Sequence, residues 1–158
     1  MKKKCIVVTV SRQFLKQHPR AGDETGFLEK IKEQIKKHTI RGNYEWWKKR
    51  IDMIIRDEAY LSIRYWTGSP YNYQRDGSKQ AELVQLHAKD GVGIEKLEFS
   101  SGQFNCMLVN DQYCFTDIEN SIAKNDGLSF EDFEAWFRGY DLNEPMAIIH
   151  FTEFRYAD

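Results

Sequence analysis

The stretch KKHTIRGN, residues 36–43, marks the point where a helical pattern gives way to an extended one. Before it, the apolar residues of 27–37 recur at helical spacing and predict an amphipathic helix. Within it, Thr39–Arg41 is short and β-prone, and Gly42-Asn43 is a turn signal. Polar side chains therefore gather at a helix-to-strand junction. The stretch is either a solvated helix end or the rim of a pocket.

Strand and helix patterns follow on both sides of this junction. Apolar alternation and β-branched runs predict strands at 5–10, 58–66, 80–88, 93–99, 104–109, 113–115 and 146–156. Helical spacing predicts further helices at 44–57, 117–124 and 129–137, the last with Ser129 as its N-cap. This order predicts an α+β fold with a mostly antiparallel, barrel-like sheet.

Length and charge limit the class of protein. The 158 residues suit one domain, 1–158, that is long enough to bury a core. Lys and Arg total 23 against 24 for Asp and Glu, so the net charge is −1. This balance argues against a protein that wraps double-stranded DNA, which needs a strongly basic face. A local basic groove stays open, because the distribution of charge matters more than its sum.

The N-terminus and the cysteines bear on the compartment. The apolar run at 5–10 is six residues long, whereas a membrane span needs roughly 20. We therefore expect a first strand, and no membrane association. The three cysteines Cys5, Cys106 and Cys114 show no CxxC spacing and lie in apolar contexts, which predicts buried free thiols and a cytoplasmic protein.

Most catalytic and cofactor motifs are missing from the sequence. The histidines His18, His38, His87 and His150 have no metal-ligand spacing, so we expect no metal site. The sequence has no nucleophile elbow, P-loop or dinucleotide fingerprint. We expect no cofactor.

Aromatic residues with basic neighbours occur in three stretches, YEWWKKR, SIRYWTGSPYNYQR and FTEFRY. Stacking faces beside cations are what single-stranded nucleic acid or a nucleobase would use. The alternative is ordinary core packing, with arginines at the edge of the core.

A lysine, a hydroxyl and a carboxylate are also available near KKHTIRGN and in AKNDGLS, residues 123–129. Such a set could cleave an amide: the lysine would activate, the hydroxyl would attack or orient, and the acid would move protons. The alternative for Asp126 is an ordinary acid near the start of the next helix.

These pieces, in this order, resemble the ASCH family of the PUA-like superfamily. KKHTIRGN is similar to the family's Lys-Thr-x-[Thr/Glu]-x-Arg signature, and EAYLSIRYW to the strand that follows. IAKNDGLSFEDFEAWF resembles the late acid-plus-helix segment, and AIIHFTEFRY the closing strand. Together they cover about residues 27–156. The resemblance implies a mostly antiparallel PUA-like β-barrel, with short helices flanking a cleft that suits RNA or modified nucleosides.

One branch of the family consists of bacterial N4-acetylcytidine amidohydrolases, which use a lysine, a threonine and a glutamate. The resemblance places these roles on Lys36, Thr39 and Asp126. The chain departs from the signature at two neighbouring positions, where Lys37 replaces a hydroxyl residue and His38 an apolar one. It departs again at Asp126, which is one methylene shorter than glutamate. The chain also carries an additional loop, 11–27, and an insertion, 67–80.

Two hypotheses of function follow, and a protein-interaction role, or a cleft that serves only folding, stays open beside them. The first is a module that binds RNA, a nucleotide or a nucleoside in a basic, aromatic-lined cleft. Beside Lys36 and Thr39, this cleft would use Arg41, Arg64, Trp66 and Tyr71. The second is an amidohydrolase acting on an N4-acylated cytidine-type nucleoside, with Thr39 as nucleophile or water-orienting group, Lys36 as activator and Asp126 as general acid/base.

Overall fold

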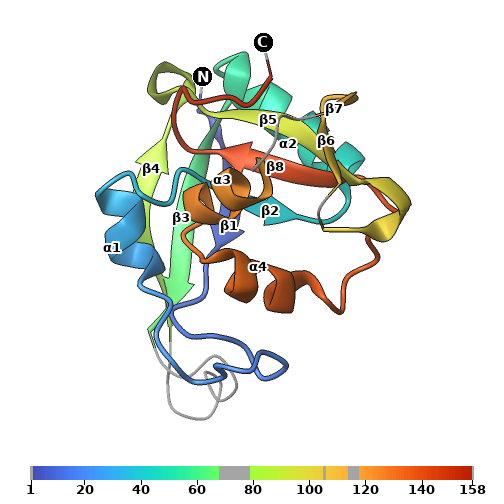
Figure 1. Cartoon of the computed structure of the whole chain (residues 1–158). Helices are drawn as coiled ribbons and strands as arrows, with labels where there is room; N and C mark the ends of the chain where they lie inside the picture. The colour runs from blue at the N-terminus through green and yellow to red at the C-terminus, as the bar shows by residue number, and fades with distance from the viewer. Residues whose placement is uncertain (1, 68–78, 105, 114–117, 158) are drawn as a thin grey trace.

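A computed structural model describes residues 2–67, 79–104, 106–113 and 118–157. Its strands form a three-stranded sheet in the order β1-β3-β4 and a five-stranded sheet in the order β2-β8-β5-β6-β7 (Figure 1). The predicted α+β class is confirmed. Within the described residues, strand pairing does not join the two sheets into one closed barrel.

The three-stranded sheet contains β1 (Lys4–Thr9), β3 (Ala59–Trp66) and β4 (Gln80–Leu86). β1 runs parallel to β3, and β4 is antiparallel to β3. Along β1, Ile6 and Val8 are buried whereas Cys5 and Val7 are exposed, as expected for a sheet covered on one face. The prediction that the cysteines are buried is therefore wrong for Cys5, which lies on the uncovered face. Cys106 is only half-buried, and Cys114 lies outside the described residues.

The five-stranded sheet contains β2 (His38–Arg41), β5 (Gly93–Phe99), β6 (Met107–Val109), β7 (Gln112–Tyr113) and β8 (Met146–His150). All its described pairings are antiparallel. β8 lies between β2 and β5, and all five of its residues are buried. A continuous apolar run is expected for a strand that is covered on both faces.

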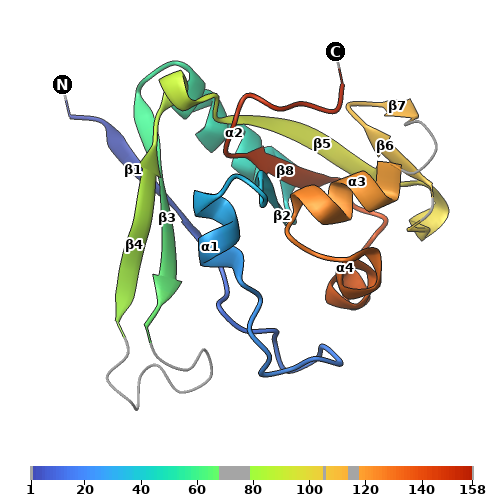
Figure 2. The ribbon, with the colours of Figure 1, turned by 60° about the vertical axis from the view of Figure 1, so that its left-hand side comes forward.

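In the described ranges, four α-helices surround the sheets: α1 (Phe27–Lys32), α2 (Tyr44–Ile55), α3 (Ile118–Asn125) and α4 (Phe130–Phe137). Two short 3₁₀ turns lie at Ala88–Asp90 and Ser100–Gly102. α2 contacts β3, β5 and β8 and so bridges the two sheets. Figure 2 shows α1 between the sheets, with α3 and α4 on the side of the five-stranded sheet away from α2. None of the helices in the described ranges is long and apolar enough to cross a membrane.

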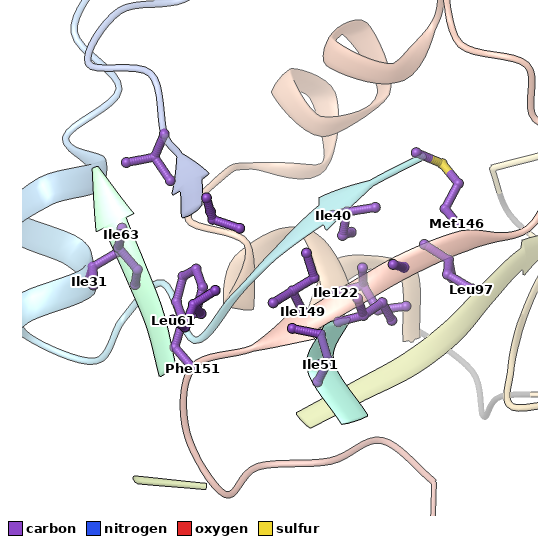
Figure 3. Close-up of a cluster of buried hydrophobic side chains, with 14 of the residues drawn as sticks. Ile31, Ile40, Ile51, Leu61, Ile63, Leu97, Ile122, Met146, Ile149 and Phe151 are labelled. Carbon is purple, nitrogen blue, oxygen red and sulfur yellow. The ribbon is translucent and has the colours of Figure 1, made fainter. Parts of the chain in front are cut away.

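One hydrophobic core connects these elements. Isoleucines of β2, β8, α2 and α3 pack together with Leu61 and Ile63 of β3 (Figure 3). Ile51, Leu61, Ile63, Ile122 and Ile149 are fully buried. This core fixes the positions of β2 and α3, the elements that carry the candidate functional site.

Candidate functional site

Lys36 is held by an irregular turn between α1 and β2. The sequence predicts a helix to residue 37, but α1 ends at Lys32, and Gln34 adopts a left-handed φ of 60°. The backbone N–H of Lys36 then donates to the Lys30 carbonyl at 3.0 Å, and the N–H of Lys37 donates to the Asn125 carbonyl at 2.7 Å. The early end of the helix turns the Lys36 side chain toward the end of α3.

Asp126 follows the last residue of α3. Its N–H closes the final turn of the helix on the Ile122 and Ala123 carbonyls, and Gly127 then continues the chain at a φ of 85°. Such a left-handed residue after a helix is the usual place for glycine. A Cβ at Gly127 would lie 3.3 Å from the Cβ of Lys36, so glycine also lets this turn approach Lys36 closely.

Lys36 and Asp126 form a buried ion pair. The Lys36 ammonium donates to Asp126 Oδ1 at 2.9 Å and to the Asp126 carbonyl at 2.7 Å. The two residues are 2% and 4% exposed, so the pair is shielded from water. Burial lowers the pKa of Lys36 although Asp126 favours its charged form. Burial opposes ionisation of Asp126, yet Lys36 and His38 together hold the pKa of its carboxyl below the usual value.

The Lys36 ammonium also contacts two features beyond the carboxylate. It lies at the C-terminal end of α3, where the helix dipole favours a cation, and it bonds the Asp126 carbonyl there. It also lies 4.2 Å from the centre of the Phe27 ring, within the range of a cation–π contact. These contacts fix the ammonium in one position.

Thr39 and Arg41 come from β2, beside this pair. Thr39 pairs with Ile149 of β8 and is buried. The Arg41 guanidinium donates to Thr39 Oγ1 at 2.8 Å and to the Thr9 carbonyl at 2.6 Å. Arg41 thus points inward, and its two Nη groups bond oxygens of the protein. A cation beside Thr39 Oγ1 favours negative charge on that oxygen.

Lys36, Thr39, Arg41 and Asp126 line one small cavity, about 20 Å³ in volume, with Trp136 in its wall. A cavity of this size has room for about one water molecule. Two larger pockets adjoin it. One, of about 140 Å³, shares Val10 and Ser11 with the cavity. The other, of about 390 Å³, shares Trp136.

The remaining residues of the predicted site lie elsewhere. Trp66 lines the adjoining 140 Å³ pocket and not the cavity itself. Arg64 lies on the open face of the three-stranded sheet, where it donates to Ser62 Oγ at 2.9 Å and lies 3.4 Å from the sulfur of Cys5. Tyr71 is outside the described residues. Among the residues with described positions, no cluster of His, Cys, Asp and Glu is suited to hold a metal ion.

The structure also reveals a cleft that the sequence analysis missed. It has a volume of about 560 Å³ and lies where the backbone N–H of Lys37 donates to the Asn125 carbonyl. The cations Lys37, Lys124 and Arg155 and the aromatic residues Phe154 and Tyr156 line it. The FTEFRY stretch, residues 151–156, was the only signal in the sequence, and it does not identify the lysines that face it.

Comparison of the chain with family models, with curated proteins and with solved structures gives no match. The functional argument therefore depends on the chemistry of the side chains that the fold brings together.

Proposed function

We propose that this chain is an amidohydrolase that removes the acyl group from an N4-acylated cytidine-type nucleoside. One observation carries the proposal. Lys36 and Asp126, 90 positions apart in the sequence, form a buried ion pair that lines the same cavity as Thr39. The resemblance to N4-acetylcytidine amidohydrolases implies a lysine, a threonine and an acid at these positions, and here the acid is an aspartate in place of their glutamate.

Burial of this pair favours a chemical role over a packing role. Removing two charges from water is costly, and well-packed apolar residues of similar size are often as stable or more stable. Perturbed titratable groups beside a cavity are typical of reaction centres. Lys36 and His38 both approach Oδ1 of Asp126, so among the described residues Oδ2 is the oxygen left to accept a proton.

The proposed reaction adds the oxygen of water to the acyl carbon and breaks the bond between that carbon and N4. Thr39 Oγ1 either holds the water that attacks the acyl carbon or attacks that carbon itself. Lys36 activates the attacking oxygen, and Asp126 takes its proton and returns it to N4 as the amine leaves. Where Thr39 attacks, the resulting acyl-threonine ester is then hydrolysed by water, which restores the Thr39 hydroxyl. The second hydrogen of water leaves as the product acid ionises. The base would enter through the 140 Å³ pocket, where Trp66 offers a stacking face.

An ASCH-type, PUA-like fold is part of the same proposal. It is supported by the order of the elements around the site: a helix, the strand that carries Thr39 and Arg41, a second helix, and a final strand, β8, that pairs with β2. It is also supported by the acidic residue at the turn before α4, which begins at the N-cap Ser129.

The test is release of acetate from N4-acetylcytidine by the purified protein. Thr39→Val and Lys36→Met keep the size of the side chains but remove the reacting groups, so we expect rates roughly 100-fold or more below wild type. Lys32→Met removes an exposed lysine of α1 and should leave the rate unchanged. No turnover by wild type across cytidines with different N4-acyl groups would reject the hydrolase.

A second candidate function is binding of RNA or a nucleotide, and the 560 Å³ cleft favours it. Its lining includes three cations and no carboxylate among the described residues. The Lys37 ammonium lies 5.0 Å from the centre of the Phe154 ring, so a cation and a stacking face are adjacent. Single-stranded nucleic acids are bound by such combinations.

Salt dependence tests this second function with a labelled single-stranded RNA. Lys37→Gln combined with Lys124→Gln should reduce the slope of log affinity against log salt by about 1.4, since each lost phosphate contact removes about 0.7. Lys89→Gln, an exposed lysine of the 3₁₀ turn after β4, serves as the control. Equal slopes for the three proteins would remove this cleft from consideration.

A further inference from the structure

Trp136, on α4, is part of the wall of two neighbouring spaces. It lines the 20 Å³ cavity beside Lys36 and Asp126, and it also lines the 390 Å³ pocket. No other residue with a described position lines both. The indole therefore stands between a space for one small group and a space with room for a chain of several carbon atoms.

We infer that Trp136 determines which acyl groups the reaction centre accepts: its indole closes the cavity behind the acyl methyl group, so that acetyl fits and longer chains do not. This inference rests on the proposed amidohydrolase function. It adds a specificity-determining residue to the lysine, threonine and aspartate of that site.

The lining of the cavity has a polar part and an apolar part. Lys36, Thr39 and Asp126 supply the groups of the proposed reaction, whereas Phe27 and Trp136 present aromatic rings. The methyl group of an acetyl substrate makes no hydrogen bonds, so it is favoured against the rings and away from the ion pair. The acyl chain is therefore expected to point toward the indole.

The base and a longer acyl chain need separate spaces. In the proposed reaction the base occupies the 140 Å³ pocket, which adjoins the cavity through Val10 and Ser11. The cavity itself, at about 20 Å³, has room for about one group of the size of water. Each further carbon of the chain must then pass Trp136 to reach the 390 Å³ pocket.

Aromatic packing holds the indole in this place. The centre of an indole ring lies 5.7 Å from that of Phe27 on α1, 5.8 Å from that of Phe14 and 6.1 Å from that of His18. These distances lie in the range of stabilising aromatic pairs. Three rings from two segments of the chain therefore resist the shift of Trp136 that a longer acyl chain requires.

The additional loop, 11–27, is fastened to the helix that carries Trp136. His18 Nδ1 accepts the backbone N–H of Arg20 at 3.0 Å, which leaves the other ring nitrogen to donate to the Asp132 carbonyl at 3.1 Å. The Arg20 guanidinium also donates to Asp132 Oδ2 at 2.6 Å. The loop thus forms one side of the 390 Å³ pocket and holds Trp136 in its wall.

A pair of substrates measures the role of Trp136. Wild type should hydrolyse N4-acetylcytidine with a higher kcat/KM than N4-hexanoylcytidine. Trp136→Leu removes the ring and should raise the ratio of the hexanoyl to the acetyl kcat/KM by roughly 10- to 200-fold, the effect of chain length in an apolar pocket. General loosening of the fold would lower both rates together and leave the ratio unchanged. An unchanged ratio, or a wild type that prefers the hexanoyl substrate, would overturn the inference.

Two further variants keep the test decisive if Trp136→Leu folds poorly. Trp136→Phe keeps an aromatic ring against Phe14 and Phe27 but is smaller, so it should raise the ratio in the same direction by less. Trp46→Leu is the matched control, since this tryptophan of α2 is 43% exposed and lines neither the cavity nor the two pockets beside it. A rise in Trp46→Leu as large as in Trp136→Leu would count against the inference.

Binding of the neutral amides acetamide and hexanamide needs no turnover and so separates this inference from the proposed reaction. Both carry the amide group of the substrate, and they differ in chain length. In nuclear magnetic resonance titrations, Trp136→Leu should bind hexanamide roughly 10-fold or more tighter than wild type does, with little change for acetamide. No gain for hexanamide would overturn the role of Trp136 even in an active enzyme. An inactive wild type whose Trp136→Leu variant gains hexanamide binding would reject only the hydrolase.

Discussion

Asp126 and Glu95 are two buried carboxylates with opposite surroundings. Glu95, on β5, is 2% exposed and accepts hydrogen bonds on both oxygens, as its four donors show: His150 Nε2 at 2.8 Å, the N–H of Tyr156 at 2.8 Å, the N–H of Ala157 at 2.9 Å and Asn110 Nδ2 at 3.4 Å. Asp126 is 4% exposed and contacts Lys36 and His38 through Oδ1.

The difference separates a structural acid from a candidate reactive one. Burial disfavours the Glu95 carboxylate, but His150 and two backbone N–H groups hold its pKa below the usual value. These bonds tie the C-terminal segment to β5 and leave no acceptor for a substrate. Asp126 faces a cavity and keeps an acceptor free of partners among the described residues. Saturation of hydrogen bonds, more than burial, distinguishes the two acids.

The largest expected effect is on activity. Asp126→Asn removes the proton acceptor and should lower the hydrolysis rate by roughly 10²- to 10⁴-fold. Glu95→Gln should leave the rate of the folded fraction close to wild type, because Glu95 does not line the cavity. Steady-state rates, corrected for the folded fraction by circular dichroism, make the comparison. Equal losses of rate in both variants would show that Asp126 is no more a reactive acid than Glu95.

Stability should separate the two acids less than activity does. Glu95→Ala leaves His150 and two backbone N–H groups without a buried acceptor, and should lower the free energy of unfolding by ~3–5 kcal/mol. Asp126→Asn keeps an oxygen for Lys36 but leaves its buried ammonium without a counter-charge, so a loss of similar size, ~3–5 kcal/mol, is expected. Urea unfolding of both variants measures this. Wild-type stability of Glu95→Ala would contradict the assignment of Glu95 as the structural acid.

The Glu95–His150 pair should also make stability depend on pH. Burial lowers the pKa of His150 from 6.5 to about 4, even though Glu95 favours the charged ring. The unfolded chain therefore takes up this proton at a higher pH than the folded protein. The stability contributed by neutral His150 is complete above pH 6.5 and decreases as the pH falls toward 4, by about 3 kcal/mol in total.

Urea unfolding between pH 7 and pH 4 tests this pH dependence, with His150→Gln as the comparison. The variant should be less stable at pH 7 but should lose less stability on acidification, because it lacks the titrating ring. Parallel curves for the two proteins would show that other groups cause the acid sensitivity.

The sequence predicts where the strands lie better than it predicts which face of a sheet a side chain points to. The alternation in 58–66 and the apolar run of 146–150 correspond to β3 and β8, since burial of one or both faces leaves a direct pattern. Alternation does not say which face is covered, and so Arg64 was expected in a cleft but lies on the open face of the sheet.

The site shows the same limit. Lys36, Thr39 and Asp126 could be named as a group only from the family resemblance, because sequence spacing cannot bring together residues 90 positions apart. The early end of α1 depends on the contact of Lys36 with the end of α3, which no helical pattern encodes. Glu95 gave no signal, because a glutamate in a strand has the same pattern whether it faces solvent or a buried partner.

The smallest expected effect concerns the backbone that brings Asp126 to Lys36. Gly127→Ala places a side chain at a φ of 85° and a Cβ 3.3 Å from Lys36 and from Phe27, which should cost about 1–2 kcal/mol for the left-handed backbone. Gly139→Ala is the control, because a Cβ there meets nothing within 4 Å. Glu95 lies within a regular strand and has no such turn beside it.

Activity should respond more strongly than stability. The added Cβ at residue 127 would shift Lys36 slightly, and a small shift of a reacting group should lower the activity of Gly127→Ala more than its loss of stability explains. If activity falls only in proportion to the folded fraction, the close approach of this turn serves the fold, and the contrast between the two acids lies in their hydrogen bonds alone.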